Sequence, residues 1–207
     1  MFRDIVIPSN NETEFIELAS RLGIKKLYFV YHFDSYYEEK IQKKLNLIKN
    51  HHNVTLEIGF LVNQKNLNKA YKQSKLLIVK SSNKDRFFIE SKKIKLIYGF
   101  EEVYKKDYLH QRASGLNHTI CELAKENNVA IGFAYSSLFN KSSQITPLLI
   151  GRIMQNVALC QKYKVKTIIG SFSENPFAMR SFYDIISLFN IFGMDSKRIK
   201  ESLANDI

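Results

Sequence analysis

Short apolar runs alternate with amphipathic stretches along the whole chain. The runs are rich in Val, Ile, Leu and Phe and show no clean alternation of apolar and polar residues, which is typical of strands buried on both faces. They predict strands over Arg3–Ile7, Lys26–Tyr31, Thr55–Leu61, Leu76–Val79, Lys95–Tyr98, Val129–Phe133 and Thr167–Gly170.

The stretches between these runs carry apolar residues at helical spacing. They predict helices over Glu12–Leu22, Tyr36–Lys49, Asn66–Gln73, Lys84–Ser91, Asn117–Asn127, Thr146–Tyr163, Ser181–Phe192 and Ser196–Leu203. Thr146 is expected to cap the long helix, with Pro147 at its first position. Ser181 begins a helix with a pattern that resembles a capping box. On the long helix, Arg152 and Asn156 lie four residues apart on a face other than the apolar stripe.

Strands that alternate with helices predict right-handed βαβ units and a parallel sheet, hence an α/β fold. The sheet could be open and doubly wound or closed. Neither a Gly-x-Gly-x-x-Gly nor a Walker loop follows any predicted strand. Seven or eight units would make a compact TIM-like (β/α) barrel, shorter than the usual ~250 residues. No linker or repeat divides the chain, so we expect a single barrel domain over residues 1–207.

The chain is basic, with a formal net charge of +11. Residues 1–103 carry 18 Lys and Arg against 12 Asp and Glu, and residues 104–207 carry 13 against 8, so the charge is spread and not confined to a tail. A basic folded surface suits an anionic partner, with nucleic acid first. The alternative is a lysine-rich genome that produces lysine-rich surfaces.

Two cysteines, Cys121 and Cys160, lie in apolar helical patterns and are expected to be buried reduced thiols. No apolar run approaches the ~18–20 residues of a membrane span. The first residues lack the basic start and long apolar core of a signal peptide. These features predict a cytoplasmic protein without a membrane partner.

Metal and nucleophile signals are weak. A phosphoesterase on such a barrel needs clustered His and carboxylate ligands at strand ends, and no His-x-His ends the first strand. His32 follows the second strand without obvious companions. Ser171 and Ser173 follow the last strand but lack the Gly-x-Ser-x-Gly pattern. We therefore predict no catalytic residue and no metal ligand in this chain.

The richest segment runs from Lys105 to Asn117 and reads KKDYLHQRASGLN. Its cationic side chains and Tyr108 precede a helix N-terminus, where free backbone N–H groups favour phosphate. Arg112 could clamp a phosphate with two parallel hydrogen bonds. The segment could also be an ordinary surface loop that leads into a capped helix. Lysines near the end of the long helix could bind phosphate or merely complement the helix dipole.

Several linked motifs resemble ribonuclease P protein component 3, the archaeal relative of the eukaryotic thirty-kilodalton subunit. The central motif is DYLHQRASGLNH at residues 107–118. The resemblance continues through LAKENNVAIGF at 123–133, RIMQN at 152–156 and LCQKYK at 159–164, and ends with Pro176, Met179–Ser181, Asp184 and Gly193–Met194. It is looser over the first hundred residues. Phe182 and Ala134 depart from the family pattern, where Pro and Ser are common.

The resemblance implies a barrel similar to the PHP phosphoesterases but without their metal ligands. It also implies a non-catalytic subunit that stabilises the RNase P RNA, which uses Mg²⁺ to remove the 5′ leader from precursor tRNA. The implied protein partner is component 2, a small RRM-like subunit. The chain itself would bind no cofactor and would meet precursor tRNA only indirectly.

A protein that positions a folded RNA needs phosphate contacts more than base contacts. The predicted RNA contacts are His110, Arg112, Lys125, Arg152, Lys162, Lys164 and Arg180. The residues predicted to shape the loop are Ser114, Gly115 and Asn117.

Two other functions stay open on the sequence. The first is a barrel hydrolase, a metal-dependent PHP-like phosphoesterase with a site built from His32, Asp4 and other strand-end groups. The second is an assembly protein that contacts only proteins, through the aromatic pairs Tyr36–Tyr37 and Phe87–Phe88.

Overall fold

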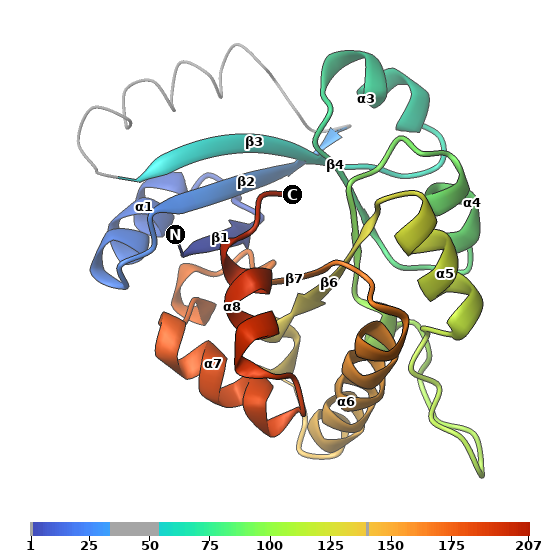
Figure 1. The fold of residues 1–207 in the computed structure, drawn as a ribbon. Helices are drawn as coiled ribbons and strands as arrows, with labels where there is room; N and C mark the ends of the chain where they lie inside the picture. The colour runs from blue at the N-terminus through green and yellow to red at the C-terminus, as the bar shows by residue number, and fades with distance from the viewer. Residues whose placement is uncertain (1, 34–53, 140) are drawn as a thin grey trace.

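The computed structural model describes residues 2–33, 54–139 and 141–207. Within them, one parallel sheet has seven strands in the order of the sequence. The strands are β1 (Arg3–Val6), β2 (Lys26–His32), β3 (Thr55–Leu61), β4 (Leu77–Lys80), β5 (Leu96–Tyr98), β6 (Ala130–Ala134) and β7 (Thr167–Gly170). Every strand was predicted to within one residue at each end. Because each strand pairs only with its sequence neighbours, the sheet curls round into a barrel (Figure 1).

The barrel is nearly closed by contacts between its first and last strands. Just past the strands, the Phe172 amide donates to the Ile5 carbonyl at 2.7 Å and the Ile7 amide donates to the Ser173 carbonyl at 2.9 Å. At the N-terminal ends of these two strands, the last helix of the chain packs against both of them. There the buried guanidinium of Arg3 donates through Nη2 to the Ser202 carbonyl of α8 (Ser196–Ala204) at 2.9 Å. The predicted TIM-like barrel is confirmed, with seven strands in the described residues.

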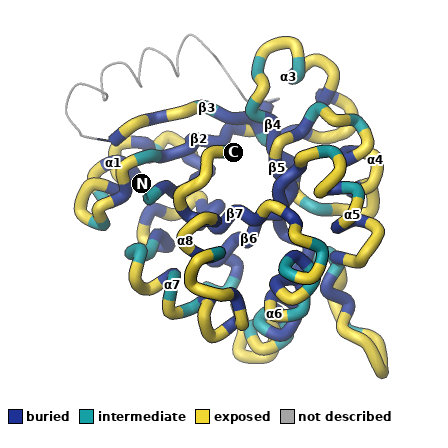
Figure 2. Tube along the Cα trace, viewed as in Figure 1, coloured by how far each residue is buried: buried dark blue, intermediate teal, exposed yellow. Residues whose placement is uncertain are grey.

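The strands separate two apolar cores. A small one fills the barrel and includes Ile5, Tyr28, Ile78 and Ile168. A large one lies between the strands and the helices and includes residues of opposite strand parity, such as Val6. The strands are therefore buried on both faces, while the outer faces of the helices are exposed (Figure 2).

The surrounding helices follow the predicted order. They are α1 (Glu12–Arg21), α3 (Leu67–Gln73), α4 (Asp85–Glu90), α5 (His118–Glu126), α6 (Ile145–Tyr163), α7 (Phe182–Ile191) and α8, with 3₁₀ turns η2 (Phe100–Glu102), η3 (Tyr135–Leu138) and η4 (Pro176–Ala178). The predicted helix Tyr36–Lys49 lies outside the described residues. Ser181 caps α7 as predicted, because its hydroxyl accepts a hydrogen bond from the Asp184 amide.

The predicted start of α6 is wrong. The helix begins at Ile145, and Thr146 lies inside its first turn, where its hydroxyl donates to the Ser142 carbonyl at 3.3 Å. Pro147 is then the third helical residue. Proline is tolerated there because no N–H group of the first turn has an intrahelical acceptor.

The end of the chain covers the N-terminal end of the barrel (Figure 1). One carboxylate oxygen of Asp206 accepts hydrogen bonds from the Lys26 ammonium at 2.6 Å and the Tyr28 hydroxyl at 2.8 Å. Ile207 packs against the core inside the barrel. The opposite, C-terminal end carries the loops that follow the strands, and we refer to it as the mouth.

The two cysteines are buried and free, as predicted. Cys121 of α5 and Cys160 of α6 face each other, and their mutual hydrogen bond, together with burial, raises the pKa of Cys160. Among the helices that the structure describes, none is both long enough and apolar enough to cross a membrane.

Candidate nucleic-acid interface

The segment between η2 and α5 extends away from the barrel beside α6 (Figure 1). We call residues 104–117 the projecting loop. A tight turn forms its tip, where the Tyr108 amide donates to the Gln111 carbonyl at 2.9 Å. Leu109 is 91% exposed and Tyr108 is 61% exposed. The tip therefore presents an apolar residue and an aromatic ring to whatever the loop meets.

The loop is fastened to α6 by Arg152, whose residue surface is only 1% exposed. Its Nε donates to a carboxylate oxygen of Asp107 at 2.8 Å, and its Nη1 donates to the carbonyls of Glu101 and Tyr104 at 2.9 and 2.6 Å. A buried side chain with these partners holds the loop and does not face solvent. The prediction that Arg152 contacts RNA directly is therefore corrected.

Asp107 joins the two arms of the projecting loop. The oxygen that binds Arg152 also accepts the Ala113 amide at 2.8 Å. Partial burial opposes ionisation of this carboxyl, but the hydrogen bonds and the positive charges of Arg152 and Arg112 keep the pKa of Asp107 below its ordinary value. Asp107 was not predicted as a site residue, although its place in the motif put it five residues before Arg112.

The second arm of the loop is fixed at its base. The Asn156 amide donates to the Ser114 carbonyl at 3.0 Å, and both residues are buried. Gly115 has a φ of +79°, and a Cβ there would lie 2.2 Å from the Phe100 carbonyl oxygen. The Asn117 side chain accepts the Ile120 amide at 2.9 Å and caps α5. These contacts set the conformation in which the loop meets the helix.

The loop presents its cations from this fixed base. Lys105, Lys106, His110 and Arg112 are exposed. The Arg112 guanidinium lies against α6 at Gly151, where an added Cβ would be 2.9 Å from Nε. Gly151 therefore gives Arg112 its place, a role that the sequence did not reveal. A planar guanidinium held this way can offer two donors to one phosphate.

Arg180 follows η4 and is half-buried. Its Nη1 donates to the carbonyls of Phe177 and Met179 at 2.9 and 2.8 Å, and its Cζ lies 4.3 Å from the Phe139 ring centroid. Its side chain thus orders its own loop at the mouth. Contact between Arg180 and RNA stays a prediction.

Three predicted contacts lie at the other end of the barrel. Lys125 is in the last turn of α5, and Lys162 and Lys164 end α6, so all three precede strands and are exposed. They belong to a larger set of lysines at or shortly before the starts of β2, β4, β5, β6 and β7, which we call the lysine rim: Lys25, Lys26, Lys75, Lys92, Lys93, Lys95, Lys125, Lys162, Lys164 and Lys166. The rim is the larger cationic feature that sequence reasoning missed.

Most of this charge is unneutralised. In the part of the chain that the structure describes, Lys26 is the only rim lysine with an ion pair, to Glu57 at 2.7 Å and Asp206 at 2.6 Å. Partial burial, together with the charges of Arg3 and Lys95, lowers the pKa of Lys166. Crowded like charges without carboxylate partners make an electrostatic surface for a polyanion.

The alternative metal site of Asp4 and His32 is not formed. Asp4 is buried on the face of β1 opposite to Ile5, and accepts hydrogen bonds from the amides of Ile5 and Ser171 and from the Tyr135 hydroxyl, at 2.8, 2.6 and 3.0 Å. His32 is exposed at the mouth. The two side chains cannot share one metal ion. Among the described residues, no group of three His, Cys, Asp or Glu could hold a metal.

The aromatic residues predicted to contact only proteins differ in how far they are exposed. Phe88 is 3% exposed and belongs to the large core, so it adds little to an outer surface for a protein partner. Phe87 is 44% exposed. Tyr36 and Tyr37 lie outside the described residues.

Comparisons with known proteins agree with this geometry. The family model of RNase P subunit p30 matches residues 1–206. Ribonuclease P protein component 3 of Methanothermobacter thermautotrophicus is 24% identical over 198 residues, which cover 90% of this chain and 78% of that protein. The same component of Methanococcoides burtonii is 34% identical over 84 residues, which cover 41% of this chain and 35% of that protein.

Two solved structures share the fold. A chain in the cryo-EM structure of archaeal ribonuclease P with mature tRNA superposes with a TM-score of 0.79 at 18% identity, over 97% of this chain and 87% of that one. Ochratoxinase from A. niger superposes with a TM-score of 0.61 at 8% identity, over 98% of this chain and 69% of that one. At these identities, the structural likeness supports the barrel fold alone.

Proposed function

The chain belongs to the RNase P subunit p30 family, and from that premise we propose that it binds and stabilises the catalytic RNA of ribonuclease P without cutting RNA itself. The RNA, with Mg²⁺, would remove the 5′ leader from precursor tRNA. The observation that carries the proposal is the projecting loop, whose motif resembles that of the family and whose cations stand on a network formed by Asp107 with the buried Arg152 and Asn156.

The physical chemistry supports an RNA partner over a small substrate. Arg112 and the neighbouring lysines offer charge-assisted hydrogen bonds to phosphates, and the exposed Tyr108 ring offers a stacking surface for an unpaired base. The lysine rim adds a field that attracts any polyanion. The metal-dependent phosphoesterase is not favoured, because Asp4 and His32 face different sides of the sheet.

The remaining parts of the proposal rest on the family. The protein partner would be component 2, the RRM-like subunit, and precursor tRNA would be met through the RNA. The chain would bind no cofactor of its own, since Mg²⁺ would serve the RNA. We also propose a cytoplasmic location, which the buried free thiols suit.

The test is cleavage of precursor tRNA by reconstituted RNase P RNA at low Mg²⁺. Four reactions are compared: the RNA alone, the RNA with component 2, the RNA with component 2 and this chain, and this chain alone. We expect cleavage only when both proteins are present. Arg112→Ala should impair the rescue, and Arg21→Ala, which removes an exposed cation of α1 far from the loop, is the matched control.

Two results would overturn the proposal. One is cleavage by the chain alone that survives repurification and disappears on chelation. The other is full rescue by component 2 without this chain. A third result is rescue by the chain that neither Arg112→Ala nor rising salt weakens. It would support a role as a subunit but contradict the proposed RNA contact at Arg112.

A further inference from the structure

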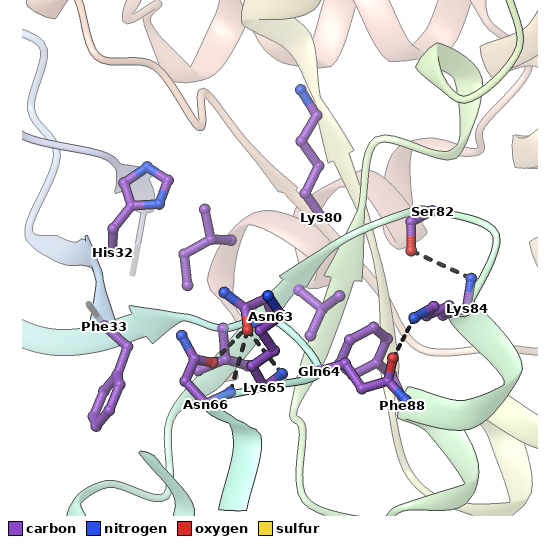
Figure 3. Close-up of a pocket in the computed structure, with 13 residues that line it drawn as sticks. His32, Phe33, Asn63, Gln64, Lys65, Asn66, Lys80, Ser82, Lys84 and Phe88 are labelled. Carbon is purple, nitrogen blue, oxygen red and sulfur yellow. Dashed lines mark hydrogen bonds between the residues drawn. The ribbon is translucent and has the colours of Figure 1, made fainter. Parts of the chain in front are cut away.

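A hollow of about 510 Å³ opens at the mouth, between the segments that follow β3 and β4 (Figure 3). Its floor is apolar and consists of the buried side chains of Val62, Val79 and Phe88. Its volume lies within the ~300–1,000 Å³ of small-molecule sites. It is separate from the projecting loop, which follows β5.

The edge of the hollow carries two lysines. Lys65 and Lys84 line it and are exposed, as is the His32 imidazole, and no Asp or Glu is among its described lining residues. Lys84 donates to the neutral side-chain amide of Gln64, and Lys65 forms no ion pair within the described chain. Lys80 also lines the hollow but pairs with Glu102 at 2.8 Å. Two ammonium groups thus border one cavity without a carboxylate to neutralise them.

The hollow also carries neutral hydrogen-bonding groups. The Ser82 hydroxyl and the Gln64 side-chain amide lie near Lys84, and the Asn63 side-chain oxygen accepts the Lys65 backbone amide (Figure 3). An apolar floor, amide and hydroxyl groups, and a cationic edge together match a base, a ribose and a phosphate. Ligands of parallel (β/α) barrels bind at this end, where the loops that follow the strands gather.

We propose that this hollow binds one nucleotide, with its phosphate at Lys65 and Lys84 and its base over the apolar floor. A free mononucleotide and an unpaired nucleotide of an RNA strand share this chemistry. The site does not depend on the proposed function, because a free mononucleotide can occupy it in the absence of RNase P RNA.

The experiment is a titration of the full chain with AMP, followed by methyl NMR signals of Val62 and Val79. Adenosine and inorganic phosphate are titrated in parallel. We expect saturable shifts with AMP and about tenfold weaker binding of adenosine, because the charge-assisted phosphate contacts are lost. Lys65→Ala/Lys84→Ala should weaken AMP binding by about tenfold for the same reason.

The matched control is Lys69→Ala/Lys72→Ala, which removes two exposed lysines of α3 that do not line the hollow. It should leave AMP binding unchanged. An equal loss in both double variants, or equal affinities for AMP and adenosine, would overturn the site as non-specific attraction. Absence of saturable shifts would overturn it outright.

A second arm identifies the source of the nucleotide. A single-stranded RNA pentamer that shifts the same methyl signals at lower concentration than AMP would assign the site to an RNA strand. A pentamer that binds more weakly than AMP at these signals would assign it to a free nucleotide. Neither titration bears on the cleavage of precursor tRNA by the reconstituted complex. The nucleotide site and the proposed function can therefore be disproved independently.

Discussion

The projecting loop and the lysine rim are both cationic, but they are built in opposite ways. The loop's cations stand on a backbone fixed by buried hydrogen bonds from Arg152 and Asn156. Most of the rim's lysines are exposed side chains spread around the starts of five strands, and only Lys26 has an ion pair among the described residues. The projecting loop has a defined shape, whereas the lysine rim contributes mainly a positive electrostatic potential.

The difference teaches what each surface can contribute to RNA binding. A fixed arrangement can select one orientation of its partner, because its donors do not have to be ordered on binding. A set of surface lysines attracts phosphates regardless of sequence and loses that attraction as salt rises. Within the proposed function, the loop would set the register of the RNA and the rim would raise its affinity.

The largest effect on the projecting loop is expected from a change at Arg152. Arg152→Ala leaves the partly exposed Asp107 carboxylate and two carbonyls without their donor. An acceptor left unsatisfied in the interior costs about 1–3 kcal/mol, so the three together should cost about 3–5 kcal/mol. We expect a loss of that size in the free energy of unfolding, with faster proteolysis inside residues 104–117. Chemical denaturation and limited proteolysis measure the two effects.

The control for this change is Arg21→Ala, which should alter the free energy of unfolding by less than about 0.5 kcal/mol. Arg152→Lys should lower the free energy of unfolding by an intermediate amount, since an ammonium group cannot reproduce the several donors of a guanidinium. Unchanged stability and unchanged proteolysis of Arg152→Ala would show that the loop holds itself.

The foundation of the loop should also respond to pH. Glu101 is 1% exposed, its carboxylate oxygens have no hydrogen-bond partner among the described residues, and burial raises its pKa to about 7. Because the folded state binds the proton more tightly than the unfolded state, this group's contribution is complete below about pH 4.5. It is lost as the pH rises to about 7, by about 3 kcal/mol.

Glu101→Gln keeps the neutral form and should remove that part of the pH dependence. Denaturation at pH 5 and pH 8 of both proteins gives the comparison, because all other titrating groups are shared. Equal pH dependence in the two proteins would mean that Glu101 is ionised at no such cost.

A smaller effect is expected at the backbone of the loop. Gly115→Ala places a methyl 2.2 Å from a carbonyl oxygen at a φ of +79°, and should cost about 2 kcal/mol. Gly23 is a matched control, since its φ is +73° with nothing within 4 Å of an added Cβ. Gly23→Ala carries only the backbone strain. If the two variants unfold at the same denaturant concentration, the close approach at Phe100 is relaxed without cost.

Arg112 is the exposed cation that the fixed part of the projecting loop supports. Arg112→Ala should weaken binding of RNase P RNA by about tenfold, as expected for one charge-assisted contact. The free energy of unfolding should stay within about 0.5 kcal/mol of its original value. Gly151→Ala, which crowds the guanidinium, should weaken binding too, but add little in the Arg112→Ala background. Additive effects would place Gly151 and Arg112 in separate roles.

The fold was largely readable from the sequence because apolar runs between helical patterns specify buried parallel strands. Ser181 could be identified as a cap because its partner Asp184 lies at fixed local spacing. The start of α6 could not be placed, because proline fits any position of a first turn. Features that depend on residues close together in the sequence, such as strands and helix caps, could therefore be predicted.

The site was less readable because its key contacts join distant segments. Arg152 was assigned to RNA for its charge, whereas 45 residues of separation from Asp107 hid their ion pair. The only local signal was that Arg152 and Asn156 share a polar face on an otherwise apolar helix. The lysine rim did have a signal, since Lys25, Lys75 and Lys166 stand just before predicted strands. That signal emerges only when the strand starts are viewed together at one end of a barrel.

The smallest effects are expected on the rim, and they complete the contrast. Lys125→Ala should weaken RNA binding by no more than about twofold, because one of many surface charges is lost. The triple variant with Lys162→Ala and Lys164→Ala should also flatten the dependence of log K on log salt, by about 1 for each phosphate contact removed. Arg112→Ala should flatten the same dependence by only about 1 while costing more affinity at every salt concentration. A triple variant with an unchanged salt slope would remove the rim from the interface, and a single rim lysine as costly as Arg112 would show that the rim, too, holds its partner in a fixed geometry.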